Sequence, residues 1–274
     1  LPLGQKASFR LTLIGVFFSI FIPGAISGDV VKIAFATKKF PDKKTELSLS
    51  VLVDRIIGMA GLFFMAAIMM TVCWRQLLEV CQQHRGLQFG CLVILGGCLG
   101  IFILWAILLY RRKFHGKSTV RVIVKPLDSH ASLVEKIHNC CRRLEYGFVL
   151  YASHPIPLLK TCLISCLIHF CHGITLYLLG RALHDVVLGV SQCNLVMQFS
   201  NVMSVIPLFP GGIGLRDLTA SLLMQAFSGE NSYGSCVPVC YTFVVLFWGG
   251  VGALAYWNKP HDYQLDNELS CNTK

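Results

Sequence analysis

Few residues of this chain could do chemistry inside apolar surroundings, and most of those few are charged. Within or beside long apolar runs the sequence places Asp29, Lys32, Asp54, Arg55, His169, His172, Arg216 and Asp217. Ionisable side chains inside membrane-length apolar segments are rare, and they usually mark the path of a substrate or an ion. Arginine also binds phosphate through two parallel hydrogen bonds. These residue types therefore favour recognition of a charged group over covalent catalysis.

Two short segments that interrupt apolar runs carry several of these charges. Residues 22–29 read Ile-Pro-Gly-Ala-Ile-Ser-Gly-Asp, and residues 210–217 read Pro-Gly-Gly-Ile-Gly-Leu-Arg-Asp. Proline removes a backbone donor and glycine tolerates angles that a helix cannot use, so each segment should break a helix. The predicted break residues are Pro23, Gly24, Gly28, Pro210, Gly211, Gly212 and Gly214. Two interrupted segments in corresponding halves of a membrane protein indicate a binding site near the middle of the bilayer.

Each charged candidate also has a purely structural interpretation. Asp29 should begin a returning half-helix, where a carboxylate can cap backbone N–H groups. Arg216 should lie at a half-helix N-terminus, where free N–H groups, the helix dipole and the guanidinium together favour an anion. The alternative for Arg216 is an ion pair with Asp29 or Asp54 that joins the two halves. Arg55 could serve either purpose, whereas Lys32 could reach the inner membrane surface.

His169 and His172 lie three residues apart, and Cys166 precedes them by another three. This spacing could suit a metal ion, but no carboxylate motif and no second ligand cluster accompanies it. Hydrogen bonds between helices are therefore expected here, and no metal site is predicted. The sequence also contains no P-loop, GxSxG, HExxH or dinucleotide-binding motif. We expect neither a cofactor nor a catalytic residue, and the residues do not predict an enzyme.

The composition indicates a membrane protein. Of the 274 residues, 54% are hydrophobic and 14% are charged, and the mean hydropathy is +0.62. Soluble domains carry about 25% charged residues. The net charge of +10 resides mainly in loops between apolar runs, which favours anionic membrane lipid over nucleic acid as the partner. The 13 cysteines are scattered through apolar stretches, which is typical of small buried side chains.

The elements that should position these residues form one all-α, polytopic transmembrane domain over residues 1–274. Membrane spans are predicted at residues 47–73, 89–110, 158–179 and 236–257, near the length of about 20 residues that crosses a bilayer. Residues 9–36 and 195–227 should each form two half-length helices around a break. Residues 132–151 repeat apolar side chains at helical spacing, which predicts an amphipathic helix on the membrane surface that anchors the bundle or guides headgroups. Residues 258–274 should form a polar tail.

Charge bias predicts how the spans are oriented. Loops 37–46 and 111–136 are rich in Lys and Arg and should be cytoplasmic, whereas the loops near Glu79 and Glu230 should be outside. With this orientation the first broken segment is a re-entrant hairpin from the inner face and the second is a hairpin from the outer face. Two opposed hairpins form an inverted repeat, with both tips near the midplane.

Three segments resemble sequence signatures of one family. Residues 21–32 are similar to the first signature of the lysylphosphatidylglycerol synthase transmembrane-region family, and residues 50–58 are similar to the segment that follows it. Residues 206–217 resemble its C-terminal signature, which commonly has Glu where this chain has Asp217. The amphipathic stretch and the His-Pro pair at 154–155 also fit. The resemblance covers nearly the whole chain, and family members usually have one or two further spans upstream, so truncation is expected.

The family includes the flippase-like membrane domain of the multiple peptide resistance factor. The resemblance implies movement of a phospholipid or lipid-linked substrate between leaflets of the prokaryotic cytoplasmic (inner) membrane. The expected lipid-binding residues are Asp29, Asp54, Arg55, Arg216 and Asp217. The alternative is a membrane-embedded component of a glycosyl- or aminoacyl-transferase system, which binds a lipid-phosphate donor and works with a soluble transferase. A scaffold without transport and a homo-oligomer both stay open.

Overall fold

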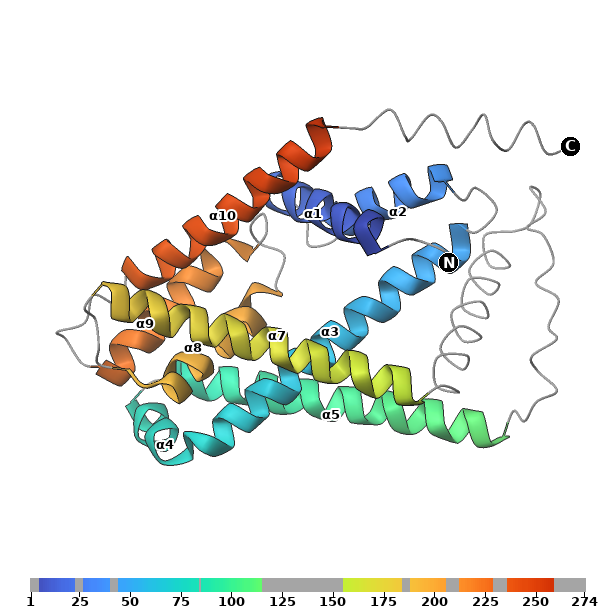
Figure 1. Ribbon diagram of the computed structural model, residues 1–274. Helices are drawn as coiled ribbons and strands as arrows, with labels where there is room; N and C mark the ends of the chain where they lie inside the picture. Colours follow the sequence, from blue (N-terminus) through green and yellow to red (C-terminus); the bar gives the residue numbers. More distant parts are fainter. Residues whose placement is uncertain are drawn as a thin grey trace, which may run out of the picture.

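The computed structural model describes residues 5–22, 27–39, 44–83, 85–114, 155–183, 188–205, 212–228 and 236–258. All regular structure in these residues is helical, which confirms the predicted all-α fold (Figure 1). The helices are α1 (Gln5–Phe21), α2 (Ser27–Lys39), α3 (Lys44–Val72), α4 (Trp74–Gln83), α5 (Arg85–Phe114), α7 (Pro155–Ala182), α8 (Val190–Ser204), α9 (Leu215–Ser228) and α10 (Cys236–Trp257).

Four helices in the described part of the chain are long and apolar enough to cross a membrane. The candidate spans are Glu46–Val72 in α3, Arg85–Ile107 in α5, Ile156–Ala182 in α7 and Cys236–Trp257 in α10. Each overlaps one of the four spans expected from the sequence. Large apolar side chains such as Phe102 and Phe247 are exposed on these helices. Such a surface suits lipid, because acyl chains are as apolar as the side chains that they contact.

α1 and α2 pack antiparallel across the first break. A Cβ atom on Gly28 would lie 2.0 Å from Ser19 Oγ and 2.3 Å from the carbonyl oxygen of Gly15. A Cβ atom on Gly15 would lie 2.2 Å from Cε of Lys32. Glycine at these two positions therefore lets the helix backbones approach closely. The arrangement is helix, break, helix, as expected for residues 9–36, and the re-entrant path through one membrane face stays a prediction.

α8 is the central helix of the bundle. Residues 193–200 are all buried, and α8 packs against α3, α5, α7 and α9. After the second break, Gly212 and Gly214 have φ angles of 71° and 93°, in the left-handed region that favours glycine. A Cβ atom on Gly212 would lie 2.7 Å from Cβ of Ser204, so the end of α8 lies close to the start of α9.

α10 contacts both broken segments. Near its start, Thr242 meets α9, and further along Gly249 packs on Ile20 of α1. The Arg10 side chain of α1 donates through Nε and Nη2 to the carbonyl oxygen of Ala255, at 3.1 and 2.9 Å. Figure 1 shows α1 and α2 beside the C-terminal part of α10. Thr242 and Gly249 are separated by seven residues, or roughly 10 Å at 1.5 Å per residue.

The connection near Glu79 is helical, and its predicted place on the outer side of the membrane stays a prediction. Glu79, expected in an outer loop, lies on α4, which buries Leu77 and Val80 against the core. A helix of ten residues is too short to cross a membrane, so a search for spans does not find it. Several other predictions fall outside the described residues: the amphipathic helix at 132–151, the tail beyond Asn258, loop residues 115–136, Glu230, and the break residues Pro23, Gly24, Pro210 and Gly211.

Candidate functional site

Two polar clusters lie at corresponding places in the chain. Asp29 is the third residue of α2, and Asp217 is the third residue of α9. Each carboxylate contacts a side chain on the next helix, Arg55 on α3 and Thr242 on α10. The sequence separations are 26 and 25 residues. We call the two groups the Asp29 cluster (Asp29, Lys32 and Arg55) and the Arg216 cluster (Arg216, Asp217, Tyr241 and Thr242).

In the Asp29 cluster one buried carboxylate faces two cations. Nε of Arg55 donates a hydrogen bond to Oδ2 of Asp29. Nζ of Lys32 lies 3.5 Å from Oδ1 of the same carboxylate, one helical turn away. The side chain of Asp29 is 4% exposed, whereas that of Arg55 is 50% exposed. The cluster therefore joins α2 to α3 and carries a surplus positive charge on a guanidinium that other groups can reach.

Asp54 is placed differently from the other predicted site residues. It is exposed on α3, where its charge acts on the neighbouring Arg55 without being buried in the bundle. The negative charge of Asp54 therefore partly balances the surplus positive charge of the Asp29 cluster, although Asp54 is not a member of that cluster.

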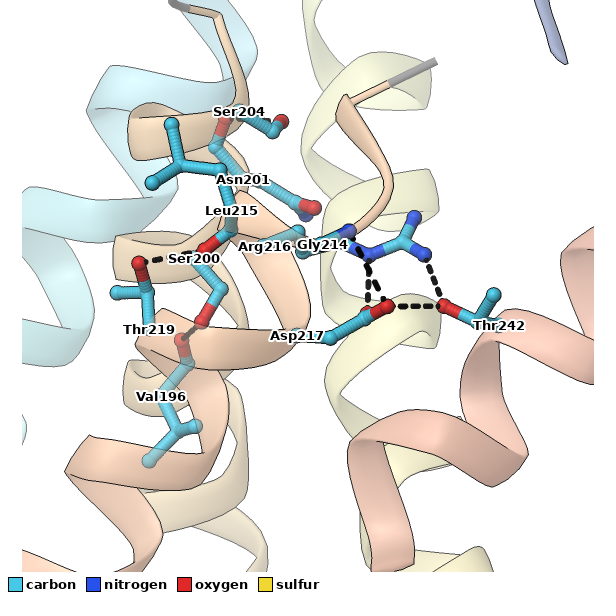
Figure 2. A network of polar contacts seen from close by, with 10 residues as sticks. All are labelled: Val196, Ser200, Asn201, Ser204, Gly214, Leu215, Arg216, Asp217, Thr219 and Thr242. Atoms are coloured by element: carbon cyan, nitrogen blue, oxygen red, sulfur yellow. Dashed lines mark hydrogen bonds and ion pairs between the residues drawn. The ribbon is translucent and has the colours of Figure 1, made fainter. Parts of the chain in front are cut away.

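In the Arg216 cluster the cation itself is buried. Figure 2 shows a closed triangle of contacts between Arg216, Asp217 and Thr242. Nε of Arg216 lies 3.3 Å from Oδ1 of Asp217, and Nη2 donates to the Thr242 hydroxyl at 2.7 Å. That hydroxyl in turn donates to Oδ2 of Asp217 at 2.7 Å. The Arg216 side chain is 9% exposed, and the Asp217 side chain is 15% exposed.

The guanidinium of Arg216 is held in a fixed orientation, but not all of its N–H donors are used. Its Cζ lies 4.8 Å from the centre of the Tyr241 ring, at cation–π distance. The backbone N–H of Gly214 donates to Oδ2 of Asp217 at 3.4 Å and helps to hold that carboxylate. Within the described part of the chain, two of the five guanidinium N–H donors are used, by Asp217 and Thr242. The other three are suited to an anion at the first turn of α9.

Among the residues that the structure describes, no ion pair joins the two clusters. The alternative in which Arg216 pairs with Asp29 or Asp54 is not what the described contacts show. Asp29 contacts Arg55 and Lys32, while Arg216 contacts Asp217 and Thr242. The two halves are connected instead by helix packing, most directly through α10.

Sequence reasoning missed Thr242 and Tyr241. Both lie within a long apolar span and neither is charged, and Pro238, three residues before Tyr241, lies in the first turn of α10 without breaking the helix. The only available signal was the pair of polar-tipped side chains side by side early in a long apolar run. What assigns them to the site is the way α9 packs against α10, which no local pattern contains.

His169 connects two helices through a hydrogen bond, as expected. Nε2 of His169 lies 3.3 Å from the carbonyl oxygen of Gly58 on α3, and the His169 and His172 rings are 5.8 Å apart, edge to face. The described residues include no group of three or more His, Cys, Asp or Glu side chains arranged to hold a metal ion.

Comparison with known proteins assigns the family. No curated protein and no solved structure is similar enough to this chain to count as a match. The family model described as "Lysylphosphatidylglycerol synthase TM region" matches residues 1–252, which include both broken segments and all four candidate spans except the last turn of α10. The chain therefore belongs to the lysylphosphatidylglycerol synthase transmembrane-region family.

Proposed function

We propose that this protein moves a phospholipid, or another lipid with a phosphate headgroup, between the two leaflets of a membrane. The observation that carries the proposal is the buried guanidinium of Arg216, which retains three N–H donors beside the N-terminus of α9. A phosphate oxygen matches these donors in charge and geometry. Membership of a membrane family named for a lipid-synthesising enzyme supports a lipid as the ligand.

The headgroup would move through the bundle while the acyl chains stay in the bilayer. A charged group near the bilayer centre costs about 2.5–3.5 kcal/mol on insertion scales, and a fixed cation on the path lowers that barrier. The Arg216 cluster would bind the phosphate most firmly. Arg55 would provide a second binding position, because its exposed guanidinium can exchange Asp29 for a phosphate oxygen.

The location follows the same proposal. The protein would lie in the cytoplasmic membrane of a prokaryote, with loops 37–46 and 111–136 on the inner side. The two broken segments would enter from opposite faces, so that the two clusters are reached from opposite leaflets. Asp54 would act only as a surface charge near the entrance, because it is exposed.

The test is leaflet exchange by the purified protein in liposomes that contain fluorescent phosphatidylglycerol. Arg216→Lys keeps the charge but removes the forked donor geometry, so exchange should fall while the fold remains intact. Arg75→Lys is the matched control, because Arg75 is an exposed arginine on α4 and belongs to neither cluster. Equal exchange rates in Arg216→Lys and Arg75→Lys would reject a phosphate site at Arg216.

A second candidate is a membrane component that presents a lipid phosphate to a soluble transferase. The family description favours it, because it names a synthase and not a transporter. In that case the protein should bind the lipid and stimulate the transferase without any leaflet exchange. The liposome assay separates the two functions directly.

A further inference from the structure

The interface between α7 and α8 contains a strip of buried polar atoms without partners in the described part of the chain. These atoms are Nδ1 of His169, Nδ1 of His172, Oδ1 of Asn194 and Oε1 of Gln198. Asn194 and Gln198 are fully buried. Buried polar atoms in native proteins almost always have a partner, so four exceptions in one interface need an explanation. Elsewhere in the described residues no buried side-chain nitrogen or oxygen shares this condition.

Contacts between the two helices bring these residues to one strip. Nε2 of Gln198 donates to the carbonyl oxygen of His169 at 2.9 Å. A Cβ atom on Gly173 would lie 2.1 Å from Oδ1 of Asn194. The pairs 169 with 198 and 173 with 194 define an antiparallel register. Because residues three and four apart share one helix face, His169 and His172 line the same strip as the two amides.

The strip contains acceptors that face no donor. The side-chain nitrogens of Asn194 and Gln198 donate to the carbonyl oxygens of Val190 and His169, which identifies the unpartnered amide atoms as oxygens. Nε2 of His169 faces the carbonyl oxygen of Gly58, an acceptor, so Nε2 carries the proton and Nδ1 has a free lone pair. One added proton would turn an imidazole Nδ1 from acceptor into donor, in an interface whose other unpartnered atoms are acceptors.

The strip also reaches the Arg216 cluster. The ring of His172 lies 6.3 Å from the ring of Tyr241, edge to face, and the guanidinium of Arg216 lies over that same ring. The charged or titratable groups around the histidines are Tyr241 on α10, Arg216 and Asp217 on α9, Cys166 on α7, and Asp54 and Arg55 on α3, one turn before Gly58. α8 contributes the neutral amides of Asn194 and Gln198 to the same interface. Arg216 therefore opposes a proton on His172, and an anion bound to Arg216 would remove that opposition.

We propose that the pair His169 and His172 is a proton-binding site coupled to anion binding at Arg216. The proposal rests on the proposed function, because the coupled anion is the lipid phosphate. Without the anion both imidazoles are neutral. When the anion binds, a proton from bulk solution attaches to Nδ1 of His172, which then becomes an N–H donor in the interface that holds the two unpartnered amide oxygens. An alkali cation is disfavoured as the ligand, because half of the unpartnered atoms are imidazole nitrogens and alkali-type hard ions prefer oxygen.

Coupling of this kind is reciprocal, so the anion must bind more tightly as the pH falls. The probe is dihexanoyl phosphatidylglycerol, whose phosphodiester stays singly charged between pH 5.5 and about 8. Binding to the purified full chain is measured by calorimetry at several pH values, in two buffers of different ionisation enthalpy and at constant sodium. For one linked proton, the affinity should rise by up to about tenfold per pH unit, and protons should be taken up on binding.

The variants test which residues hold the proton. His172→Gln should keep probe binding but lose both the proton uptake and the pH dependence, whereas the matched control Cys171→Ser, an exposed α7 position, should keep both. Should His172→Gln not fold, ¹⁵N NMR of the histidine rings in the native protein gives the answer, because adding the probe should protonate a ring nitrogen.

The results that would contradict the coupling differ from those that would also contradict the proposed function. Binding that is independent of pH and releases or takes up no protons would overturn the coupling while leaving the anion site at Arg216 intact. In a second series at fixed pH and varied sodium, affinity that depends on sodium in place of pH would show a metal cation and would also overturn the coupling. No binding at any pH, or binding unaffected by Arg216→Lys, would overturn both the proposed function and the coupling.

Discussion

The Asp29 and Arg216 clusters occupy corresponding positions but bury opposite charges. In the first, the carboxylate of Asp29 is buried and its partner Arg55 is half exposed. In the second, the guanidinium of Arg216 is buried and is held by Asp217, Thr242 and Tyr241. The same helix-break-helix design thus gives one cluster with an exposed, exchangeable cation and one with a fixed cation.

This difference between the clusters suits two steps in the proposed movement of a headgroup, namely entry and selection. A half-exposed arginine makes only weak net interactions, because water screens it and its side chain stays mobile. A buried, oriented arginine interacts more strongly with an anion, because the surroundings are less polar and the donors are already positioned. Under the proposed function, the Asp29 cluster would admit the headgroup and the Arg216 cluster would select it.

The largest expected effect is a difference in the free energy of unfolding between variants of the two arginines. Arg216→Ala leaves the carboxylate of Asp217, whose side chain is 15% exposed, without its cation, which should lower the free energy of unfolding by about 3 kcal/mol. Arg55→Ala should cost less, about 1 kcal/mol, because Arg55 is half exposed and Lys32 stays beside Asp29. Chemical unfolding in detergent measures both. Equal losses would show that burial does not distinguish the clusters.

A second change tests how the first cluster is positioned. Gly28→Ala would drive a methyl group into Ser19 and the Gly15 backbone, so α1 and α2 must move apart. Such overpacking should cost about 1–3 kcal/mol. Gly250→Ala is the control, since a Cβ atom there meets nothing within 4 Å. Thermal unfolding of the two variants side by side would disprove the close packing if their midpoints agree.

A smaller effect tests the hydroxyl that closes the second cluster. Thr242→Val keeps the shape of the side chain but removes the bonds to Arg216 and Asp217, which should cost about 1–2 kcal/mol. Lipid exchange should fall with it, because the guanidinium loses its orientation. Thr175→Val removes only a bond to a carbonyl oxygen of its own helix and should change unfolding little. A Thr242 variant with native stability and exchange would exclude the hydroxyl from the site.

The smallest effect is expected at Asp54. It is exposed, so Asp54→Asn should change the free energy of unfolding by less than about 0.5 kcal/mol. Asp29→Asn serves as the comparison, because that carboxylate is buried between two cations. A larger loss from Asp54→Asn than from Asp29→Asn would reverse the assignment of the buried acid.

The long helices could be predicted from the sequence because a membrane span is a local property. Twenty apolar residues predict a helix whatever surrounds them, and α3, α5, α7 and α10 lie where such runs occur. The charged residues were also visible, because charge is rare in these runs. α4 was missed because its apolar residues cover one face of a short helix, and that pattern needs a partner surface to be meaningful.

The partners of the charged residues could not be predicted in the same way. Arg55 is separated from Asp29 by 26 residues, and Thr242 from Asp217 by 25, so each contact depends on how two helices pack. An ion pair between Arg216 and an acid of the first half was equally reasonable from charge alone. The structure favours local partners because each post-break helix packs against the helix that follows it in the chain.

The most direct test of the central claim is leaflet exchange of fluorescent phosphatidylglycerol in liposomes containing Arg216→Lys or the native protein at equal, verified amounts of folded protein. The account predicts that the protein-dependent rate falls at least about tenfold, or 1.4 kcal/mol in the barrier, while the unfolding midpoint stays near that of the native protein. A folded Arg216→Lys protein that exchanges lipid at the native rate would contradict the account, since the fixed guanidinium would then have no part in moving the headgroup.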